Sequence, residues 1–310
     1  MTVPPGCKTL INIKPKRNMR RFIFNTAMLA GCFAAAAGNT PEAYRLFDNS
    51  GREVTFDQMT DSLSRADVVF IGENHNCPIS HWMELEITRA MHNIHGRALT
   101  LGEEMMEADN QLLLDEYLTR KIDYDRFEAE ARLWDNYQTD YYPVVFYAKD
   151  NGIPFVATNI PRRYASVVKN KGLEALDSLS DEARRYIAPL PIPFLFDKEK
   201  SNEAFGMMQA LGGRTSGDME RLAQAQAVKD ATMAWFISRN IGDGRFIHIN
   251  GSYHSDNRDG IIPYLLRYRP GTRVATVTSV RQERIDALDP ENMGRADFYI
   301  AVPEDFPTSY

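Results

Sequence analysis

Cysteine is scarce in this sequence, with three residues in 310, at Cys7, Cys32 and Cys77. No Cys-x-x-Cys-His motif is present, which excludes covalent attachment of haem to such a motif. The glycine-rich phosphate loops are also missing, since the sequence has no Gly-x-Gly-x-x-Gly after a strand and no Walker loop. The Gly-x-Ser-x-Gly turn of α/β-hydrolases is absent as well. These absences argue against c-type cytochromes, dinucleotide-binding proteins, P-loop proteins and serine hydrolases.

Long hydrophobic runs are missing too. No apolar run in the sequence reaches the about 20 residues that a membrane span needs. A short apolar run at residues 22–30 follows Arg20 and Arg21 and leads into Leu29-Ala30-Gly31-Cys32. A basic segment, a short apolar segment and small residues before a cleavage point form a secretory signal. The tetrad resembles a bacterial lipobox, so we expect diacylation of Cys32. The predicted organisation is a signal peptide at residues 1–31 (with Met19 as our hypothesis for the start), a lipidated tether at 32–40 and one domain at 41–310.

Basic residues are fewer than acidic ones, 36 against 42, which gives a formal net charge of −6. Residues 1–31 hold six basic and no acidic residues, so processing would change the net charge from −6 to −12. Phosphate backbones repel an acidic domain, and we therefore expect no nucleic acid partner. After processing and acylation Cys77 is the one free thiol, so no intrachain disulfide is expected. We interpret Cys77 as a small buried core residue.

The remaining sequence alternates short apolar segments with helical ones. Amphipathic spacing predicts helices, of which residues 78–95 form a clear example. Strands are predicted at residues 67–71, 97–104, 153–158, 246–250 and 273–280, with an edge strand at 298–302. This alternation predicts an α/β fold with a mostly parallel central sheet flanked by helices. The helical stretches at residues 110–149 and 181–239 predict a helical cap inserted between strands.

One pattern occurs twice, each time after a predicted strand: Gly72-Glu73-Asn74-His75 and Gly251-Ser252-Tyr253-His254. Glycine lets the backbone turn sharply at such a point. The carboxyl ends of parallel strands meet at one edge of a sheet, where ligands bind. We therefore expect His75 and His254 to share a crevice.

Other polar residues follow predicted strands, among them Glu104, Arg162 and Asn250. Histidine and carboxylate together are ligands for zinc, manganese or iron. His81 and Glu84 lie three residues apart on a predicted helix and share one face. That pair is a metal pair, a support for His75 or simply a solvated polar face.

Aromatic residues are concentrated around residues 134–147. Most stripes of this kind belong to a core. A flat apolar ligand such as haem would need the same kind of surface, with a tyrosine or histidine as axial ligand. Tyr137 and Tyr141 are the candidates for an axial or wall position, and Arg162 is a candidate partner of the propionates.

Together these motifs resemble the ChaN family of iron-regulated, haem-binding lipoproteins in the Tiki/TraB superfamily. The segments that carry the resemblance occur in the family's order, at residues 71–75, 101–106, 134–137, 153–162, 225–234 and 249–263. The resemblance implies a haem-binding surface in a cleft or at a homodimer interface. It also implies a role in haem or iron uptake, an outer-membrane haem receptor as partner, and a lipid anchor on the periplasmic face of the outer membrane.

The resemblance implies that Glu73, His75, Glu104, Arg162 and His254 form a polar crevice, to which the patterns above add three candidates. The expected haem- or metal-binding crevice consists of Glu73, His75, His81, Glu104, Arg162, Asn250, Tyr253 and His254. The sequence departs from the family at Ser252-Tyr253, where smaller or amide residues are expected. Tyr253 is thus either a ligand or a partial block of the pocket.

Two alternatives stay open at this point, although we expect a binding protein rather than an enzyme. In a metal-dependent hydrolase, His75 and His254 would hold a divalent ion, with Glu73 or Glu104 as general base. In a tethered scaffold, an apolar patch away from the crevice would bind a partner protein.

Overall fold

A seven-stranded sheet forms the centre of the computed structural model, which describes residues 41–195 and 216–310. The strands lie in the order β1-β7-β6-β2-β5-β3-β4. They are β1 Arg45–Asp48, β2 Val68–Glu73, β3 Leu99–Glu107, β4 Phe155–Asn159, β5 Arg245–Gly251, β6 Val274–Gln282 and β7 Phe298–Pro303. All neighbours pair in parallel except β1, which is antiparallel to β7. The predicted α/β class with a mostly parallel sheet is confirmed.

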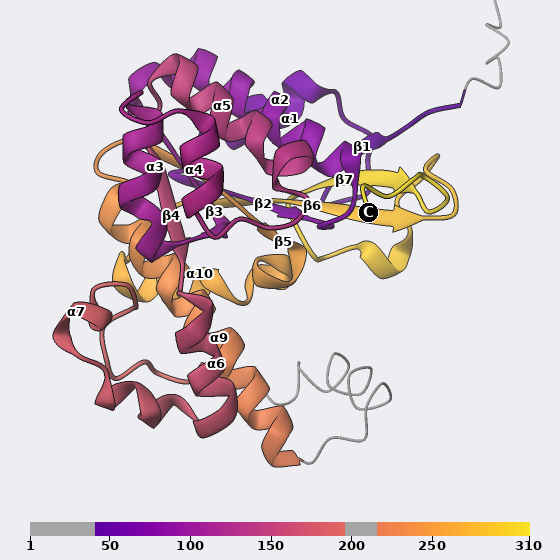
Figure 1. Cartoon of the computed structure of the whole chain (residues 1–310). Coiled ribbons are helices and arrows are strands. Elements are labelled where there is room, and N and C mark those ends of the chain that lie inside the picture. The colour runs from indigo at the N-terminus through magenta and orange to yellow at the C-terminus, as the bar shows by residue number, and fades with distance from the viewer. Residues whose placement is uncertain (1–40, 196–215) are drawn as a thin grey trace, which may run out of the picture. The chain divides into compact units, whose positions relative to one another are not determined.

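Helices cover both faces of this sheet (Figure 1). They are α1 Phe56–Leu63, α2 Pro78–His95, α3 Gln111–Leu118, α4 Tyr124–Glu130, α5 Tyr142–Asn151, α6 Arg162–Lys171, α7 Asp181–Arg184, α9 Ser216–Asn240 and α10 Ile261–Tyr268. Helices α1 to α5 lie on one face, and α6, α9 and α10 on the other. The helices inserted between strands thus flank the sheet.

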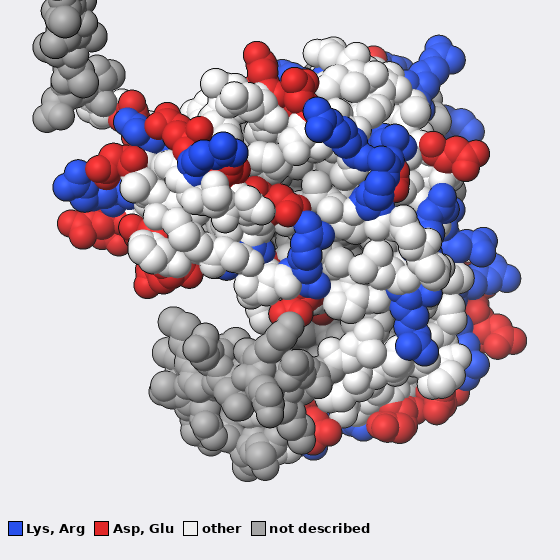
Figure 2. Space-filling view, turned by 180° about the vertical axis from the view of Figure 1, so that it is seen from behind, with Lys and Arg blue, Asp and Glu red and all other residues white. Residues whose placement is uncertain are grey.

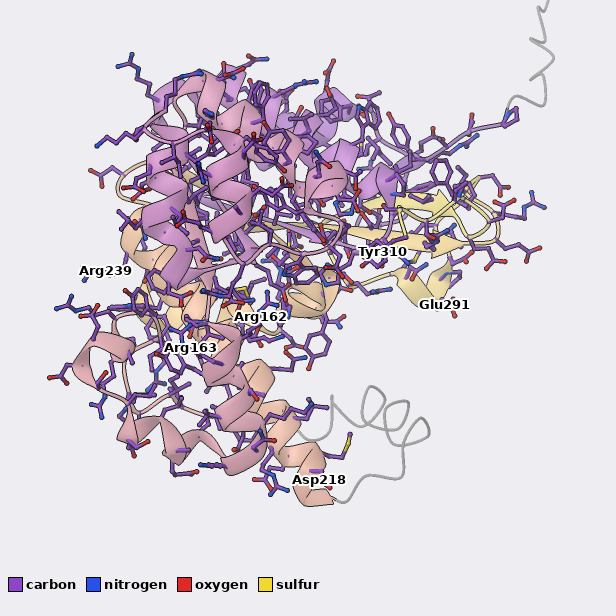
Figure 3. All side chains as sticks on the ribbon, viewed as in Figure 1. Arg162, Arg163, Asp218, Arg239, Glu291 and Tyr310 are labelled. Carbon is purple, nitrogen blue, oxygen red and sulfur yellow. The ribbon has the colours of Figure 1, made fainter. Side chains whose placement is uncertain are left out.

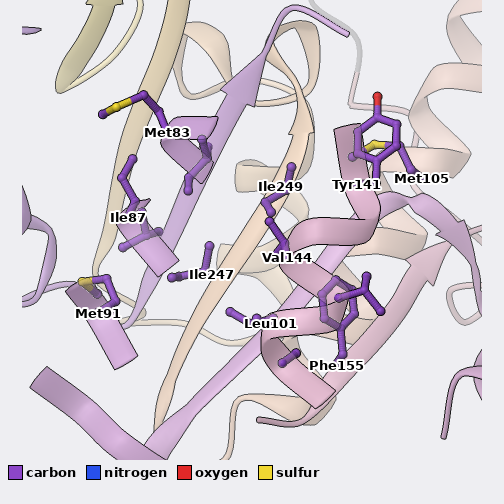
Figure 4. Close-up of a cluster of buried hydrophobic side chains, with 14 of the residues drawn as sticks. Met83, Ile87, Met91, Leu101, Met105, Tyr141, Val144, Phe155, Ile247 and Ile249 are labelled. Carbon is purple, nitrogen blue, oxygen red and sulfur yellow. The ribbon is translucent and has the colours of Figure 1, made fainter. Parts of the chain in front are cut away.

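The two-sided cover follows from the composition of the strands. Every residue of β2 is buried, as expected for a parallel strand that has helices on both faces. Side chains alternate between the faces, so that Val69 and Ile71 pack with α2 and α5, while Val68 and Phe70 pack with α9 and α10. Figure 4 shows the first of these clusters, in which Ile247 and Ile249 of β5 lie among side chains of α2 and α5.

Helix α2 carries several residues of the later argument, and its ends are well marked. Pro78 occupies its first turn, where a missing N–H costs nothing, and Gly96 follows its last residue with a φ of 54°. Cys77 precedes the helix and is fully buried, in agreement with its interpretation as a core residue.

The prediction of an edge strand near the end of the sequence was wrong. Residues 298–302 were expected to form an edge strand, but β7 lies between β6 and β1 and is paired on both sides. The edge strand next to β7 is β1, which has only four residues and therefore gives no clear alternating pattern in the sequence. The signal peptide, the acylated Cys32 and the tether lie outside the described residues.

Charges of both signs are mixed on the surface, and Figure 2 shows basic side chains next to acidic ones on the rear face. Ion pairs such as Arg273 with Asp67, at 2.6 Å, and Arg258 with Asp297, at 2.7 Å, join distant parts of the chain. Within residues 41–195 and 216–310, none of the helices combines the length and the apolar character needed to cross a membrane.

Candidate functional site

A cleft of about 1000 Å³ lies at the carboxyl ends of β3, β4 and β5 and beside the turn that follows β2. The segment between α4 and α5, one side of α9 and the last residues of the chain complete its wall. Its lining comprises His75, Glu104, Glu107, Leu133, Trp134, Asp135, Asn136, Thr139, Asn159, Ile160, Arg162, Gln226, Lys229, Gly251, Tyr253, His254, Ser309 and Tyr310. Figure 3 shows Arg162 at the start of α6 and Tyr310 at the carboxyl terminus. His75 and His254 come from turns 179 residues apart in the sequence and meet in this cleft.

The His75 ring is hydrogen-bonded through Nδ1, while its Nε2 has no hydrogen-bond partner among the described residues. Its Nδ1 lies 2.5 Å from Oε1 of the buried Glu73, and its ring lies 4.9 Å from the ring of Trp134, centroid to centroid. The His75 side chain is 35% exposed. Burial alone would lower the pKa of His75, but the hydrogen bond to Glu73 and the negative charges of Glu73 and Glu104 raise it overall. The carboxylate thus fixes the ring and leaves Nε2 facing the cleft.

Gly251 lies directly against that nitrogen. A Cβ at this position would be 2.7 Å from His75 Nε2, closer than carbon and nitrogen can approach. The backbone of Gly251 has a φ of −55°, which any residue can adopt, so space rather than conformation requires glycine here. The N–H of Gly251 donates to Glu104 Oε2 at 2.9 Å, which fixes the carboxylate beside the imidazole.

His254 is bonded at both ring nitrogens. Its Nδ1 lies 2.5 Å from Asp230 Oδ1 of α9, and its Nε2 lies 3.2 Å from Glu104 Oε1 of β3. All three residues are buried. Burial opposes the charged ring, but the charges of Glu104 and Asp230 raise the pKa of His254 to about 10. Burial likewise opposes ionisation of Glu104, but the charge of His254 lowers the pKa of that carboxyl to about 2. His254 is therefore an imidazolium clamped between two carboxyl groups.

This clamp predicts a pH-dependent stability. The contribution of His254 to the free energy of unfolding is complete below its unfolded pKa of about 6.5 and is lost as the pH rises through about 10. The contribution of Glu104 is complete above about pH 4.3 and is lost as the pH falls through about 2. Urea unfolding between pH 6 and 10 should thus show a decline in stability that is shallower in His254→Gln. Parallel pH profiles for the two proteins would contradict the clamp.

His81 does not line the cleft but lies behind it. Its Nδ1 is 3.3 Å from Oε2 of both Glu73 and Glu84, and its Nε2 is 3.2 Å from the carbonyl oxygen of His75. Burial disfavours the charged ring, yet the charges of Glu84 and Glu73 raise the pKa of His81 to about 12. His81 and Glu84 are both buried, so the interpretation as a solvated polar face was wrong.

Tyr137 and Tyr141 do not form the wall of the cleft. Both side chains are buried in the core between the sheet and α2, beneath the lining. A π-helical turn at Tyr137–Tyr141 directs them inward, and the Tyr141 hydroxyl donates to Glu73 Oε1 at 2.9 Å. The exposed aromatic surface comes instead from Trp134, Tyr253 and Tyr310, of which Tyr253 is 53% exposed.

The other predicted residues take distinct places. Arg162 lines the cleft and donates to Glu107, which also accepts from Arg132 at 3.0 Å. Asn250 lies behind the lining and is buried, where it donates to the carbonyl of Gly251 and so shapes the turn.

Sequence reasoning missed the contribution of α9. From the middle of this helix, Lys229 lines the cleft and the buried Asp230 holds His254, at positions that no motif marks. Residues 225–234 carried part of the family resemblance, and that was the one signal that could have directed attention to them.

Comparison with known proteins gives a consistent result. A profile of the family described as "Haem-binding uptake, Tiki superfamily, ChaN" matches residues 59–265. The solved structure of Campylobacter jejuni ChaN, titled for its cofacial haem binding, superposes with a TM-score of 0.65 and 17% identity, covering 84% of this chain and 96% of that chain. The Arabidopsis thaliana protein RETICULATA-RELATED 5, chloroplastic, is 24% identical over 248 residues. That match covers 74% of this chain but only 32% of the plant protein.

Proposed function

Because the chain belongs to the ChaN family of haem-binding uptake proteins in the Tiki superfamily, we propose that it binds haem in the cleft, with His75 as an iron ligand. The observation that carries this proposal is the state of the His75 ring. Nδ1 is engaged by Glu73, while Nε2 lines the cleft with no hydrogen-bond partner among the described residues. A histidine that binds a metal through one nitrogen characteristically donates from the other to a carboxylate.

The rest of the lining fits a flat, partly apolar and anionic ligand. Trp134 and Tyr253 offer aromatic surface, and Leu133 and Ile160 add aliphatic contacts. Two cations also line the cleft: Lys229, and Arg162, whose guanidinium pairs through Nε with Glu107. Propionate groups are suited to such partners, since charge-assisted hydrogen bonds to carboxylates favour lysine and arginine. When bound, haem supplies an iron centre with axial coordination positions and a strongly absorbing ring.

The competing interpretation, a metal-dependent hydrolase, requires both imidazoles on one ion. His254 does not offer a nitrogen for this purpose, because Asp230 and Glu104 engage both of its ring nitrogens. The His254 ring thus joins β3 to α9, whereas Nε2 of His75 has no hydrogen-bond partner among the described residues. The geometry therefore favours haem binding over hydrolysis.

Hemin titration tests the proposed function directly. The purified protein should develop a Soret band that saturates at a fixed stoichiometry, with a spectrum typical of imidazole ligation to iron. Far-ultraviolet circular dichroism on the same sample controls for folding. A folded protein that gives no saturable Soret band would reject haem binding.

The finer points of the function are also proposals. We propose anchoring through acylated Cys32 at the periplasmic face of a bacterial outer membrane, supported by the Leu29-Ala30-Gly31-Cys32 tetrad after a basic and apolar segment. We also propose a role in haem or iron uptake, which the family's description as haem-binding uptake proteins supports, and an outer-membrane haem receptor as partner. A homodimer that encloses haem is a further proposal, and the cofacial haem binding named for Campylobacter jejuni ChaN is compatible with it.

A further inference from the structure

We propose that Glu73, His81 and Glu84 form a second site, buried behind the cleft, that binds one divalent transition-metal ion. This site is separate from the proposed haem site, because none of its three residues lines the cleft. The one link between the two sites is the contact of Glu73 with His75. The inference therefore goes beyond haem binding and does not depend on it.

The spacing of the donor atoms matches a coordination sphere. One donor atom from each residue lies within 4.8 Å of the other two. His81 Nδ1 is 3.3 Å from Glu73 Oε2 and 3.3 Å from Glu84 Oε2. Ligand atoms about 2.1 Å from a tetrahedral ion are about 3.4 Å apart. His81 Nδ1 thus already stands at the distance from each carboxylate oxygen that an ion between them would impose.

One carboxylate oxygen of Glu73 and one of Glu84 lack a hydrogen-bond partner among the described residues. Glu73 Oε2 and Glu84 Oε1 are buried and have no hydrogen-bond partner among the described residues. Neither oxygen of the nearby, fully buried Glu103 has one either. Buried carboxylates without partners are costly, and proteins pair them or use them to coordinate metals. A cation at this point would satisfy the cluster.

The strand register explains why the carboxylates converge. Glu73 on β2 lies opposite Gly251 of β5, and Glu103 on β3 lies opposite Ile249 of the same strand. These positions share the face of the sheet that packs against α2. His81 and Glu84 lie one turn apart on α2 and face the same point. Glu103 therefore lies beside the three ligands, where burial and the negative charge of Glu73 raise its pKa to about 8.

The donor set indicates the class of ion. One imidazole nitrogen and carboxylate oxygens suit zinc, manganese or ferrous iron. His81 Nε2 lies 3.2 Å from the carbonyl oxygen of His75 and 3.4 Å from Asp140 Oδ2, which orients the ring. The ion would take the place of the proton on Nδ1, which is released to solvent when the metal binds. Through its other oxygen, Glu73 holds His75, so one carboxylate joins the buried site to the cleft.

Metal analysis tests the site without haem. The chelator-treated protein is incubated with Zn²⁺ or Mn²⁺, desalted and analysed for bound metal, and Co²⁺ is added separately to record its ligand-field absorption. We expect one ion per chain, with affinity at least about 10-fold lower in Glu84→Gln and His81→Gln. Glu86→Gln is the matched control, because Glu86 lies on the same helix, is partly exposed and pairs with Arg89 at 2.6 Å. Its affinity should equal that of the unmodified protein.

Two results would overturn the inference. The first is the absence of stoichiometric metal in the folded, unmodified protein. The second is metal binding that survives Glu84→Gln but is lost in His254→Gln, which would place the ion in the cleft. If Glu84→Gln does not fold, Glu84→Asp keeps the charge and shortens the ligand, and weaker binding is again expected. Haem binding can succeed or fail independently of each of these results.

Discussion

Replacement of Gly251 by Ala should weaken haem binding by about 10- to 100-fold while the protein stays folded. The new Cβ would lie 2.7 Å from His75 Nε2, so the ring must rotate away from its present position. The imidazole is the far end of a side chain and can move, whereas the backbone of Gly251 already has a conformation that alanine adopts. The substitution therefore displaces the proposed iron ligand without straining the turn.

Hemin titration measures the loss of haem affinity, and urea unfolding checks that the variant stays folded. His75→Ala sets the full effect of losing the ligand, and Gly251→Ala should approach it. Ser252→Ala is the matched control, since it removes a hydroxyl from the adjacent residue and adds nothing near His75. Unchanged haem affinity in Gly251→Ala, with a clear loss in another lining variant, would show that iron is ligated elsewhere in the cleft.

Much of the fold was readable from the sequence because buried parallel strands are continuous apolar runs. Helix α2 was predicted with its observed bounds, Pro78–His95, since proline and glycine mark its two ends. The order of the strands was not readable. Strand β2 pairs with β5 and β6 rather than with β3, and nothing local in these segments encodes that choice.

The same limit explains what was missed in the site. The Gly-x-x-His turns predicted that His75 and His254 would meet, because all parallel strands end at one edge. The pairing of Glu73 opposite Gly251 depends on the β2–β5 register, which the sequence does not show. Asp230 reaches His254 from the middle of α9, and only tertiary packing brings that helix to the strand ends. Tyr137 and Tyr141 point inward because of a π-helical turn, which helical periodicity cannot reveal.

Replacement of Glu73 by Leu should lower the free energy of unfolding by about 3–5 kcal/mol, the usual cost of removing one partner from a buried ion pair. Glu73 is fully buried and is shared by three groups: His75 Nδ1 at 2.5 Å, the Tyr141 hydroxyl at 2.9 Å and His81 Nδ1 at 3.3 Å. Leucine fills a similar volume but accepts no hydrogen bond. It would leave the Tyr141 hydroxyl buried without its acceptor and leave Nδ1 of His81 with Glu84 as its one carboxylate partner among the described residues.

The cause of that loss can be separated by graded variants in urea unfolding of the metal-free protein. Glu73→Gln keeps an oxygen acceptor for His75 and Tyr141 and should cost less, about 1–2 kcal/mol. Tyr141→Phe removes a single hydrogen bond and should cost about 1 kcal/mol. The double variant Glu73→Leu, Tyr141→Phe should lose less free energy of unfolding than the sum of the losses in the two single variants, because both substitutions remove the same hydrogen bond. Strict additivity, or a Leu variant as stable as the unmodified protein, would mean that Glu73 does not hold this network together. The ring of His75 would then owe its position to Trp134 and Gly251 rather than to the carboxylate behind it.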